Sequence, residues 1–106
     1  MEIMDEINKL CGRYGDEFNW GIVSQNNDFV SELEMETDIS QYNIVIAVAR
    51  SYSNDDVLFF FDNTLYRIYH LTYSKCNAKG FPKYEEFYST KEVAIYLEKQ
   101  FINQYL

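Results

Sequence analysis

Three runs of β-forming residues in the middle of the chain constrain its fold more than any other feature. Residues 42–49 form a β-branched apolar run, and residues 57–61 and 65–73 are rich in aromatic side chains. Residues 53–56 and 62–63, which separate these runs, are of the types that form tight turns. Short polar connections between apolar strands favour hairpins, so the sequence predicts a three-stranded antiparallel meander.

Helices are predicted at both ends of the chain. The first apolar stripe has helical spacing and consists of Ile3, Ile7, Leu10, Cys11 and Tyr14. Near the other end, residues 89–92 fit the S-x-x-E capping box that begins many helices. A second helical stripe follows this box and consists of Val93, Tyr96, Leu97, Phe101 and Ile102. Residues 84–88 are expected to add a short edge strand before this helix.

A second, short helix is predicted where Phe29, Val30 and Leu33 lie at helical spacing. The fold class is therefore α+β: an antiparallel sheet of three to four strands with two N-terminal helices and one C-terminal helix packed on it. All three helices are expected on one face of that sheet. With 106 residues, the chain has the length of a single domain, covering residues 1–106.

The negative charge is concentrated in the N-terminal half of the chain. The formal net charge is −8 at pH 7, from 17 Asp and Glu against 9 Lys and Arg. Residues 1–49 hold ten of these acids and two bases, whereas residues 50–106 hold seven of each. The segment 28–38 has no base and five acids, namely Asp28, Glu32, Glu34, Glu36 and Asp38. Such a segment is either a solvated face or a docking surface for a basic protein partner.

The same charge argues against direct binding to nucleic acid or to an anionic membrane surface, because clustered Lys and Arg carry both interactions. Glu32, Glu34, Glu36 and Asp38 alternate at every second position. In an extended segment they would form a negative stripe on one side, an interpretation that competes with the second helix. The spacing of a calcium-binding loop is absent, and no metal or cofactor is expected.

The ten Tyr and eight Phe residues exceed what a core of this size must bury. Tyrosine is enriched at protein interfaces, so several tyrosines are expected to be exposed, namely among Tyr66, Tyr69, Tyr73, Tyr84 and Tyr88. Tyr66 and Tyr69 are predicted to join the five acids in a partner-binding surface. The alternative is that these rings cover the sheet with their hydroxyls in water. Trp20 is either an anchor on the surface or part of the core.

His70 is the single histidine of the chain. A catalytic triad would pair it with Ser51, Ser53, Ser74 or Cys76, but none of these occupies a nucleophile elbow, and a lone histidine on a strand is usually structural. No catalytic residue is assigned, and the protein is expected not to be an enzyme. A small enzyme dependent on His70 remains an alternative.

The first residues of the chain are acidic rather than basic, and no apolar run approaches the roughly 18 residues of a membrane span. A cytoplasmic location is therefore expected. Cys11 and Cys76 lie far apart and lack metal-ligand spacing, so both are predicted to be reduced thiols.

Residues 65–74, followed by Gly80-Phe81-Pro82 and a C-terminal helix at 93–106, resemble the small acidic immunity proteins that bacteria pair with polymorphic or contact-dependent toxins. The resemblance implies a tight, stoichiometric inhibitor of a cognate toxin, commonly a nuclease, in whose basic cleft the acids would stand in for phosphates. Two other interpretations remain: a DNA-mimic antagonist of a defence complex, and a scaffolding subunit that self-associates through its aromatic sheet face. The protein is expected to be a monomer or a weak dimer.

Overall fold

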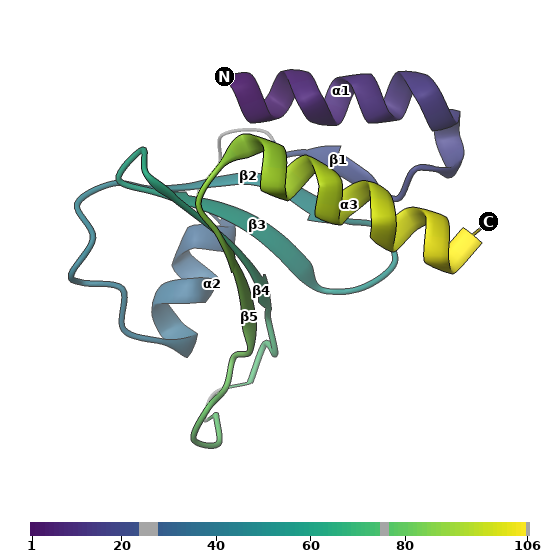
Figure 1. Cartoon of the computed structure of the whole chain (residues 1–106). Helices are drawn as coiled ribbons and strands as arrows, with labels where there is room; N and C mark the ends of the chain where they lie inside the picture. The colour runs from purple at the N-terminus through teal and green to yellow at the C-terminus, as the bar shows by residue number, and fades with distance from the viewer. Residues whose placement is uncertain (24–27, 75–76, 106) are drawn as a thin grey trace.

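The computed structural model describes residues 1–23, 28–74 and 77–105. The elements follow in the order α1 (Glu2–Tyr14), the short 3₁₀ helix η1 (Gly15–Glu17), β1 (Trp20–Ile22), α2 (Asp28–Glu36), β2 (Val45–Ser51), β3 (Asp56–Phe61), β4 (Leu65–His70), β5 (Tyr84–Phe87) and α3 (Thr90–Tyr105). Figure 1 shows a sheet with helices on it, as the sequence predicts. The α+β class and the three predicted helices are confirmed.

The sheet is antiparallel, and its strands lie in the order β1-β2-β3-β4-β5 (Figure 1). The predicted meander corresponds to β2, β3 and β4, and the predicted edge strand corresponds to β5. The sheet has five strands rather than three to four, because β1, which the sequence analysis does not predict, joins it beside β2. β1 has only three residues, with Gly21 in the middle, and is too short to show the alternating pattern by which a strand is recognised in a sequence. β1 exists because Trp20 and Ile22 pair with Ser51 and Ala49 of β2.

The β3–β4 hairpin is closed by the residues that the sequence marks as turn formers. Asp62 and Asn63 have positive φ angles of 51° and 58°, a backbone region that Asp and Asn tolerate better than most residues. Through Oδ1, Asp62 also accepts hydrogen bonds from the amides of Asn43 and Ile44, at 2.9 and 2.7 Å. This carboxylate fastens the hairpin to the segment that leads into β2.

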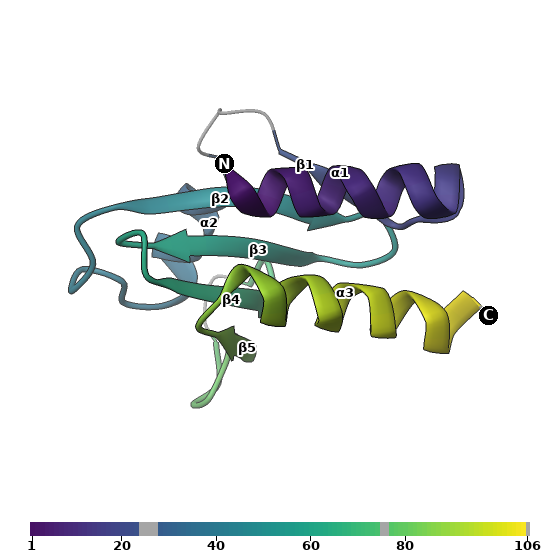
Figure 2. The same ribbon diagram turned by 45° about the horizontal axis from the view of Figure 1, so that its top comes forward.

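α1 and α3 lie side by side on one face of the sheet and run in the same direction (Figure 2). The core beneath them includes Ile3, Ile7, Leu10, Trp20, Val48, Leu58, Ile68, Val93, Leu97 and Phe101. Trp20 is therefore part of the core. The predicted cap at Ser89 is confirmed, because the Glu92 amide donates to Ser89 Oγ at 3.1 Å. The Glu92 carboxylate reaches back one residue further than in a standard capping box, because it accepts from the Tyr88 amide at 2.8 Å.

α2 packs on the opposite face of the sheet (Figure 1), so the expectation that all helices share one face is wrong. The core on this side consists of Leu33, Ile39, Val57, Phe59, Phe61, Tyr69 and Leu71. β3 explains the difference, because Leu58 faces α1 and α3 whereas the next residue, Phe59, faces α2. An apolar run without polar alternation is typical of a strand that is buried on both faces. We call the side of the sheet that carries α2 the α2 face.

None of the helices in the described ranges combines the length and the apolar character that crossing a membrane requires. Cys11 is a free thiol, and burial raises its pKa above the ordinary value. Cys76, the second predicted thiol, lies outside the described residues.

Candidate functional site

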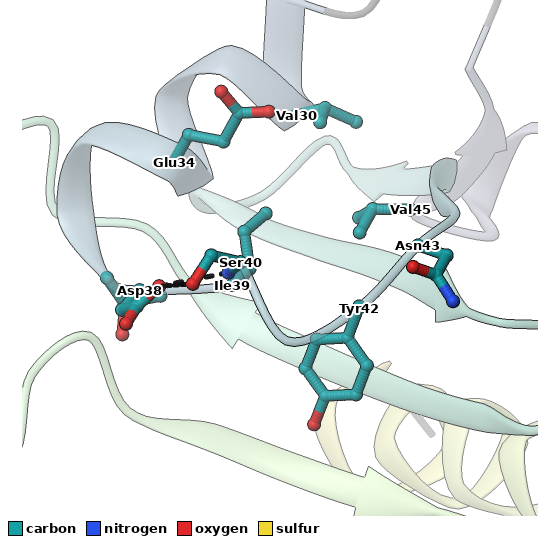
Figure 3. A pocket seen from close by; sticks show the side chains of 9 residues that line it. Val30, Glu34, Asp38, Ile39, Ser40, Tyr42, Asn43 and Val45 are labelled. Atoms are coloured by element: carbon teal, nitrogen blue, oxygen red, sulfur yellow. Dashed lines mark hydrogen bonds between the residues drawn. The ribbon is translucent and has the colours of Figure 1, made fainter.

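An open hollow lies on the α2 face between the end of α2, the segment 37–43 and the start of β2 (Figure 3). Its volume is about 540 Å³, and it is lined by Val30, Glu34, Thr37, Asp38, Ile39, Ser40, Tyr42, Asn43 and Val45. These lining residues all belong to the described part of the chain; two of them are acidic and none is basic. We call this feature the acidic hollow.

The two carboxyl groups of the acidic hollow come from different elements. Glu34 projects from α2, and Asp38 follows the end of that helix (Figure 3). Asp38 Oδ1 accepts hydrogen bonds from the Ser40 hydroxyl at 2.7 Å and the Ser40 amide at 2.9 Å, and both bonds lower the pKa of Asp38. Both side chains are exposed, so their oxygens are accessible to a cation or to a hydrogen-bond donor.

The segment that carries Asp38 is held against the sheet by Ile39 and Tyr42. Ile39 is buried in the core of the α2 face, and the Tyr42 amide donates to the Ile39 carbonyl oxygen at 3.1 Å. The centroid of the Tyr42 ring lies 4.6 Å from that of Phe61 in β3. One wall of the hollow is therefore a helix and the other is a packed segment, so its shape is formed by the fold itself.

The helical path of α2 separates the five acids that the sequence groups into one surface. Residues four apart share a side of a helix, whereas residues two apart differ in direction by about 200°. Glu32 and Glu36 therefore lie together, and Glu34 points away from them. Asp28, Glu34 and Asp38 are exposed, Glu32 is half-buried and Glu36 is buried. The interpretation of an extended stripe is wrong, because this segment is helical.

Glu36 lies inside the protein, where it is 8% exposed. Its carboxylate accepts hydrogen bonds from the amide and the hydroxyl of Thr72, both at 2.8 Å, and from the Tyr73 amide at 3.0 Å. Glu36 is thus removed from the predicted partner-binding surface, because its oxygens are already bound within the chain.

Tyr66 and Tyr69 are also removed from that surface. Tyr66 is 5% exposed on the side of α1 and α3, where its hydroxyl lies 3.0 Å from Thr90 Oγ1. Tyr69 is 2% exposed and lies in the core of the α2 face. Residues three apart on a strand point to opposite faces, and here both faces are covered. Among the tyrosine side chains that the structure describes, the exposed ones are Tyr52, Tyr73, Tyr84 and Tyr88, and the last three are among those expected to be exposed.

Arg67, which no pattern in the sequence singles out as a site residue, lies beside the acidic hollow. Its Cζ atom is 4.4 Å from the ring centroid of Tyr84 and 5.6 Å from that of Tyr42. Its Nε donates to Glu86 Oε1, and its Nη1 donates to the Tyr69 hydroxyl, both at 2.8 Å. Burial alone would lower the pKa of Arg67, but these two hydrogen bonds raise it above the ordinary value. The signal in the sequence was the alternation that puts Arg67 and Tyr69 on one face of β4.

The residues around Arg67 extend the acidic hollow toward the edge of the sheet. The Tyr88 hydroxyl donates to Glu86 Oε2, and this bond together with that from Arg67 lowers the pKa of Glu86. We call this set, Tyr42, Arg67, Tyr84, Glu86 and Tyr88, the aromatic border. Because Tyr42 lines the hollow and also lies beside Arg67, the hollow and the border form one continuous surface.

His70 lies at the other end of β4 and forms a hydrogen bond with Asp56 through Nδ1. The two residues are opposite each other in the register of β3 and β4. Among the serines considered as its partners, Ser51 is buried, and its hydroxyl lies 3.1 Å from that of Ser53. Cys76 lies outside the described residues. The contacts of the described residues thus show a His–Asp pair and do not join it to Ser51 or Ser53.

Over residues 1–23, 28–74 and 77–105, no group of three or more His, Cys, Asp or Glu side chains is arranged to hold a metal ion. No protein-family model, curated protein or solved structure matches this chain.

Proposed function

We propose that the protein is a non-enzymatic inhibitor, an immunity protein that neutralises a cognate toxin in the bacterial cytoplasm through its α2 face. The observation that carries the proposal is the acidic hollow, where exposed Glu34 and Asp38 line a preformed space of about 540 Å³. The two carboxylates suit a Lys or Arg side chain of a partner, because Lys and Arg donate charge-assisted hydrogen bonds to carboxylates. A nuclease toxin offers such side chains in the cleft that binds its substrate.

The surroundings of the hollow support a protein partner. Met35 of α2 is 72% exposed and Tyr88 of the aromatic border is 69% exposed, and both residue types are enriched at interfaces. α2 has no base, and three of its four acids, Asp28, Glu32 and Glu34, are at least partly exposed. The opposite side of the molecule mixes both signs, with salt bridges that join Lys9 to Glu6 and Arg13 to Glu98. The charged side chains that line the acidic hollow are both negative, which suits a basic partner.

The first experiment is a pull-down with the tagged protein, using the product of the adjacent gene or an extract of the native host, washed at rising salt. The expected result is a one-to-one complex with a basic protein whose activity is lost on binding. The double variant Glu34→Gln with Asp38→Asn should slow association and flatten its salt dependence. The matched control, Glu2→Gln with Asp5→Asn, removes the same charge from exposed positions on α1 and should leave binding unchanged.

Equal association rates for both double variants would exclude the acidic hollow from the function. If duplex DNA competes for the captured target, the DNA-mimic interpretation is favoured instead. A folded His70→Ala variant that loses the biological effect while it keeps its partner would favour the enzyme alternative.

A further inference from the structure

The outer edge of β5 is open to a further strand. β5 (Tyr84–Phe87) stands at the end of the strand order and pairs with β4 on its inner side (Figure 2). Within the described ranges, no strand pairs with its outer side. A strand in this position presents a row of N–H and C=O groups with which another extended chain can pair.

One contact shows how the hydrogen bonds between β4 and β5 alternate. The His70 amide donates to the Lys83 carbonyl oxygen at 2.8 Å. The register of the two strands, in which Tyr69 is opposite Tyr84, makes His70 and Lys83 directly opposite each other as well. They therefore form a hydrogen-bonded pair, and in an antiparallel ladder such pairs alternate with pairs that are not hydrogen-bonded.

This alternation decides which backbone groups of β5 face outward. Glu85 and Phe87 belong to hydrogen-bonded pairs, so their N–H and C=O groups point to β4. Tyr84 and Glu86 belong to the other pairs, so their N–H and C=O groups point away from the sheet. Side chains approach each other more closely in pairs of this second kind, which agrees with the 2.8 Å bond between Arg67 and Glu86.

The open part of this edge is short, because both of its ends are closed. Pro82 lies before β5 and has no N–H group to offer. After β5, the Tyr88 amide is already bonded to Glu92 Oε2 at 2.8 Å. The outward groups between these two ends are those of Tyr84 and Glu86. They suit a short extended segment better than a long strand.

A second copy of β5 is a poor occupant of this edge. In an antiparallel pair of copies, the alignment of Tyr84 with Glu86 places the two Glu85 residues opposite each other. The alignment of Glu86 with Glu86 places two other carboxylates opposite each other. Like charges in such positions destabilise a pair of strands. The alignment of Tyr84 with Tyr84 brings Pro82 into the ladder, where it cannot donate a hydrogen bond.

The side chains along the edge indicate what does fit it. Glu85 is exposed, and none of the ion pairs between described residues includes it. A Lys or Arg opposite Glu85 would supply a cation to this carboxylate. Tyr84 is 46% exposed, and an aromatic ring pairs well with a β-branched side chain on a neighbouring strand. The edge therefore suits a cation that has a β-branched residue on each side.

We propose that the edge of β5 binds an extended segment of a protein partner, which adds a strand to the sheet and places a Lys or Arg opposite Glu85. The backbone groups of Tyr84 and Glu86 supply the hydrogen bonds. In strand addition of this kind, such bonds give affinity and the side chains give specificity. The proposal goes beyond the inhibitor function, because it depends on the edge of β5 and not on the acidic hollow, so that either can fail without the other.

The test begins with a library of random linear peptides displayed on phage, which is selected on the immobilised whole protein. Enriched sequences are expected to hold a Lys or Arg between β-branched residues. One enriched peptide is then synthesised, and its effect on hydrogen exchange of the backbone amides is measured by NMR. In the free protein, the amides of Glu85 and Phe87 should exchange slowly and those of Tyr84 and Glu86 quickly. The bound peptide should slow the exchange of the second two.

Two variants of Tyr84 separate the backbone from the side chain. Tyr84→Ala removes the ring and keeps the outward amide. Tyr84→Pro removes both, and proline is tolerated as the first residue of a strand. Binding of the enriched peptide should be retained in Tyr84→Ala and lost in Tyr84→Pro.

A second pair of variants tests the cation. Glu85→Lys should weaken binding about fivefold, the usual effect of one pair of charges on neighbouring strands. Glu2→Lys makes the same change of charge at an exposed position of α1, and its effect should be much smaller.

The proposal is wrong if the enriched peptide binds while the amides of Tyr84 and Glu86 still exchange quickly, because the peptide then occupies another surface. It is also wrong if no peptide is enriched, or if the enriched sequences lack Lys and Arg. Equal binding by Tyr84→Ala and Tyr84→Pro would overturn it as well, because the outward amide would then contribute nothing.

Discussion

The guanidinium of Arg67 lies 4.4 Å from the ring centroid of Tyr84 while its Nε donates to Glu86, so one side chain of β4 binds two residues of β5. β5 has four residues and stands at the end of the strand order. Short edge strands gain little from backbone pairing alone. Arg67 therefore stabilises the edge of the sheet and also positions the aromatic border of the α2 face.

Replacing Arg67 with Met should destabilise the fold by about 2 kcal/mol, since a cation–π contact and charge-assisted hydrogen bonds are lost together. Urea unfolding measures the change. Arg13→Met is the control, because Arg13 is exposed in its salt bridge with Glu98, and its effect should be much smaller. Similar losses in both variants would show that Arg67 acts only as a surface charge.

Glu36→Gln should lower the free energy of unfolding by about 1 to 3 kcal/mol, the usual range for a buried hydrogen bond to a charged group. The amide side chain presents one oxygen and one NH₂ group to Thr72 and Tyr73, whose amides both need acceptors. Glu34→Gln, at an exposed position of the same helix, should stay within about 0.5 kcal/mol of the wild type. Equal values in the two variants would contradict a structural role for Glu36.

The contribution of the Glu32 and Glu36 pair to stability should be greatest near pH 4.5, the ordinary glutamate value. The raised pKa of Glu32 means that its contribution is complete below 4.5 and is lost as the pH rises to about 7. The lowered pKa of Glu36 has the opposite effect, because its contribution is present above 4.5 and is lost as the pH falls below that value. Urea unfolding from pH 3 to 8 measures the difference in the free energy of unfolding between the wild type and the double variant Glu32→Gln with Glu36→Gln. A difference that does not vary with pH would be incompatible with these shifts.

Gly21→Ala should destabilise the wild-type protein, which carries Tyr52. In a protein in which Tyr52 is replaced by alanine, the same substitution should be stabilising. A Cβ atom at Gly21 would lie 2.6 Å from Tyr52 Cζ, so the ring would have to move, and its stacking with Arg50 at 5.4 Å would be disturbed. Without that ring, alanine is favoured over glycine in a strand by roughly 0.5 to 1 kcal/mol. A double-mutant cycle with Tyr52→Ala measures the change in the free energy of unfolding that Gly21→Ala causes in each of the two backgrounds. The same sign in both backgrounds would show that Tyr52 does not limit this position.

Ser89→Ala should cost about 1 kcal/mol, the usual effect of removing a helix cap. The Ser89 hydroxyl accepts the Glu92 amide at the start of α3, and α3 supplies Val93, Leu97 and Phe101 to the core. Thermal unfolding checks this value. Ser31→Ala, at an exposed position within α2, should not reduce stability, because alanine is the better helix former. A loss in Ser31→Ala as large as that in Ser89→Ala would contradict the capping role.

The parts of the fold that follow from local sequence were predictable. The turn at Asp62 and Asn63, the helix cap formed by Ser89 and Glu92 and the alternation in β4 each depend on residues within a few positions of one another. Their physical causes are backbone preference, hydrogen bonds to nearby amides and side-chain periodicity. The same local rules gave the α+β class and the strands of the meander.

The candidate site was predictable only in part, because exposure is decided by distant segments. The acidic segment contains Glu34 and Asp38, which line the hollow, but also Glu36, which Thr72 and Tyr73 bind from 36 and 37 positions away. Nothing near Glu36 in the sequence distinguishes it from Glu34.

By itself, the sequence determined the three helices, the strands β2 to β5 and the place where the negative charge is concentrated. The tertiary structure alone decided that α2 covers the opposite face, that β1 joins the sheet and that Tyr66 and Tyr69 are buried. The physical reason is that local propensity acts within a few residues, whereas burial depends on which surfaces the packing of the whole chain brings together. The burial and the contacts of each acid and each tyrosine are decided by that packing.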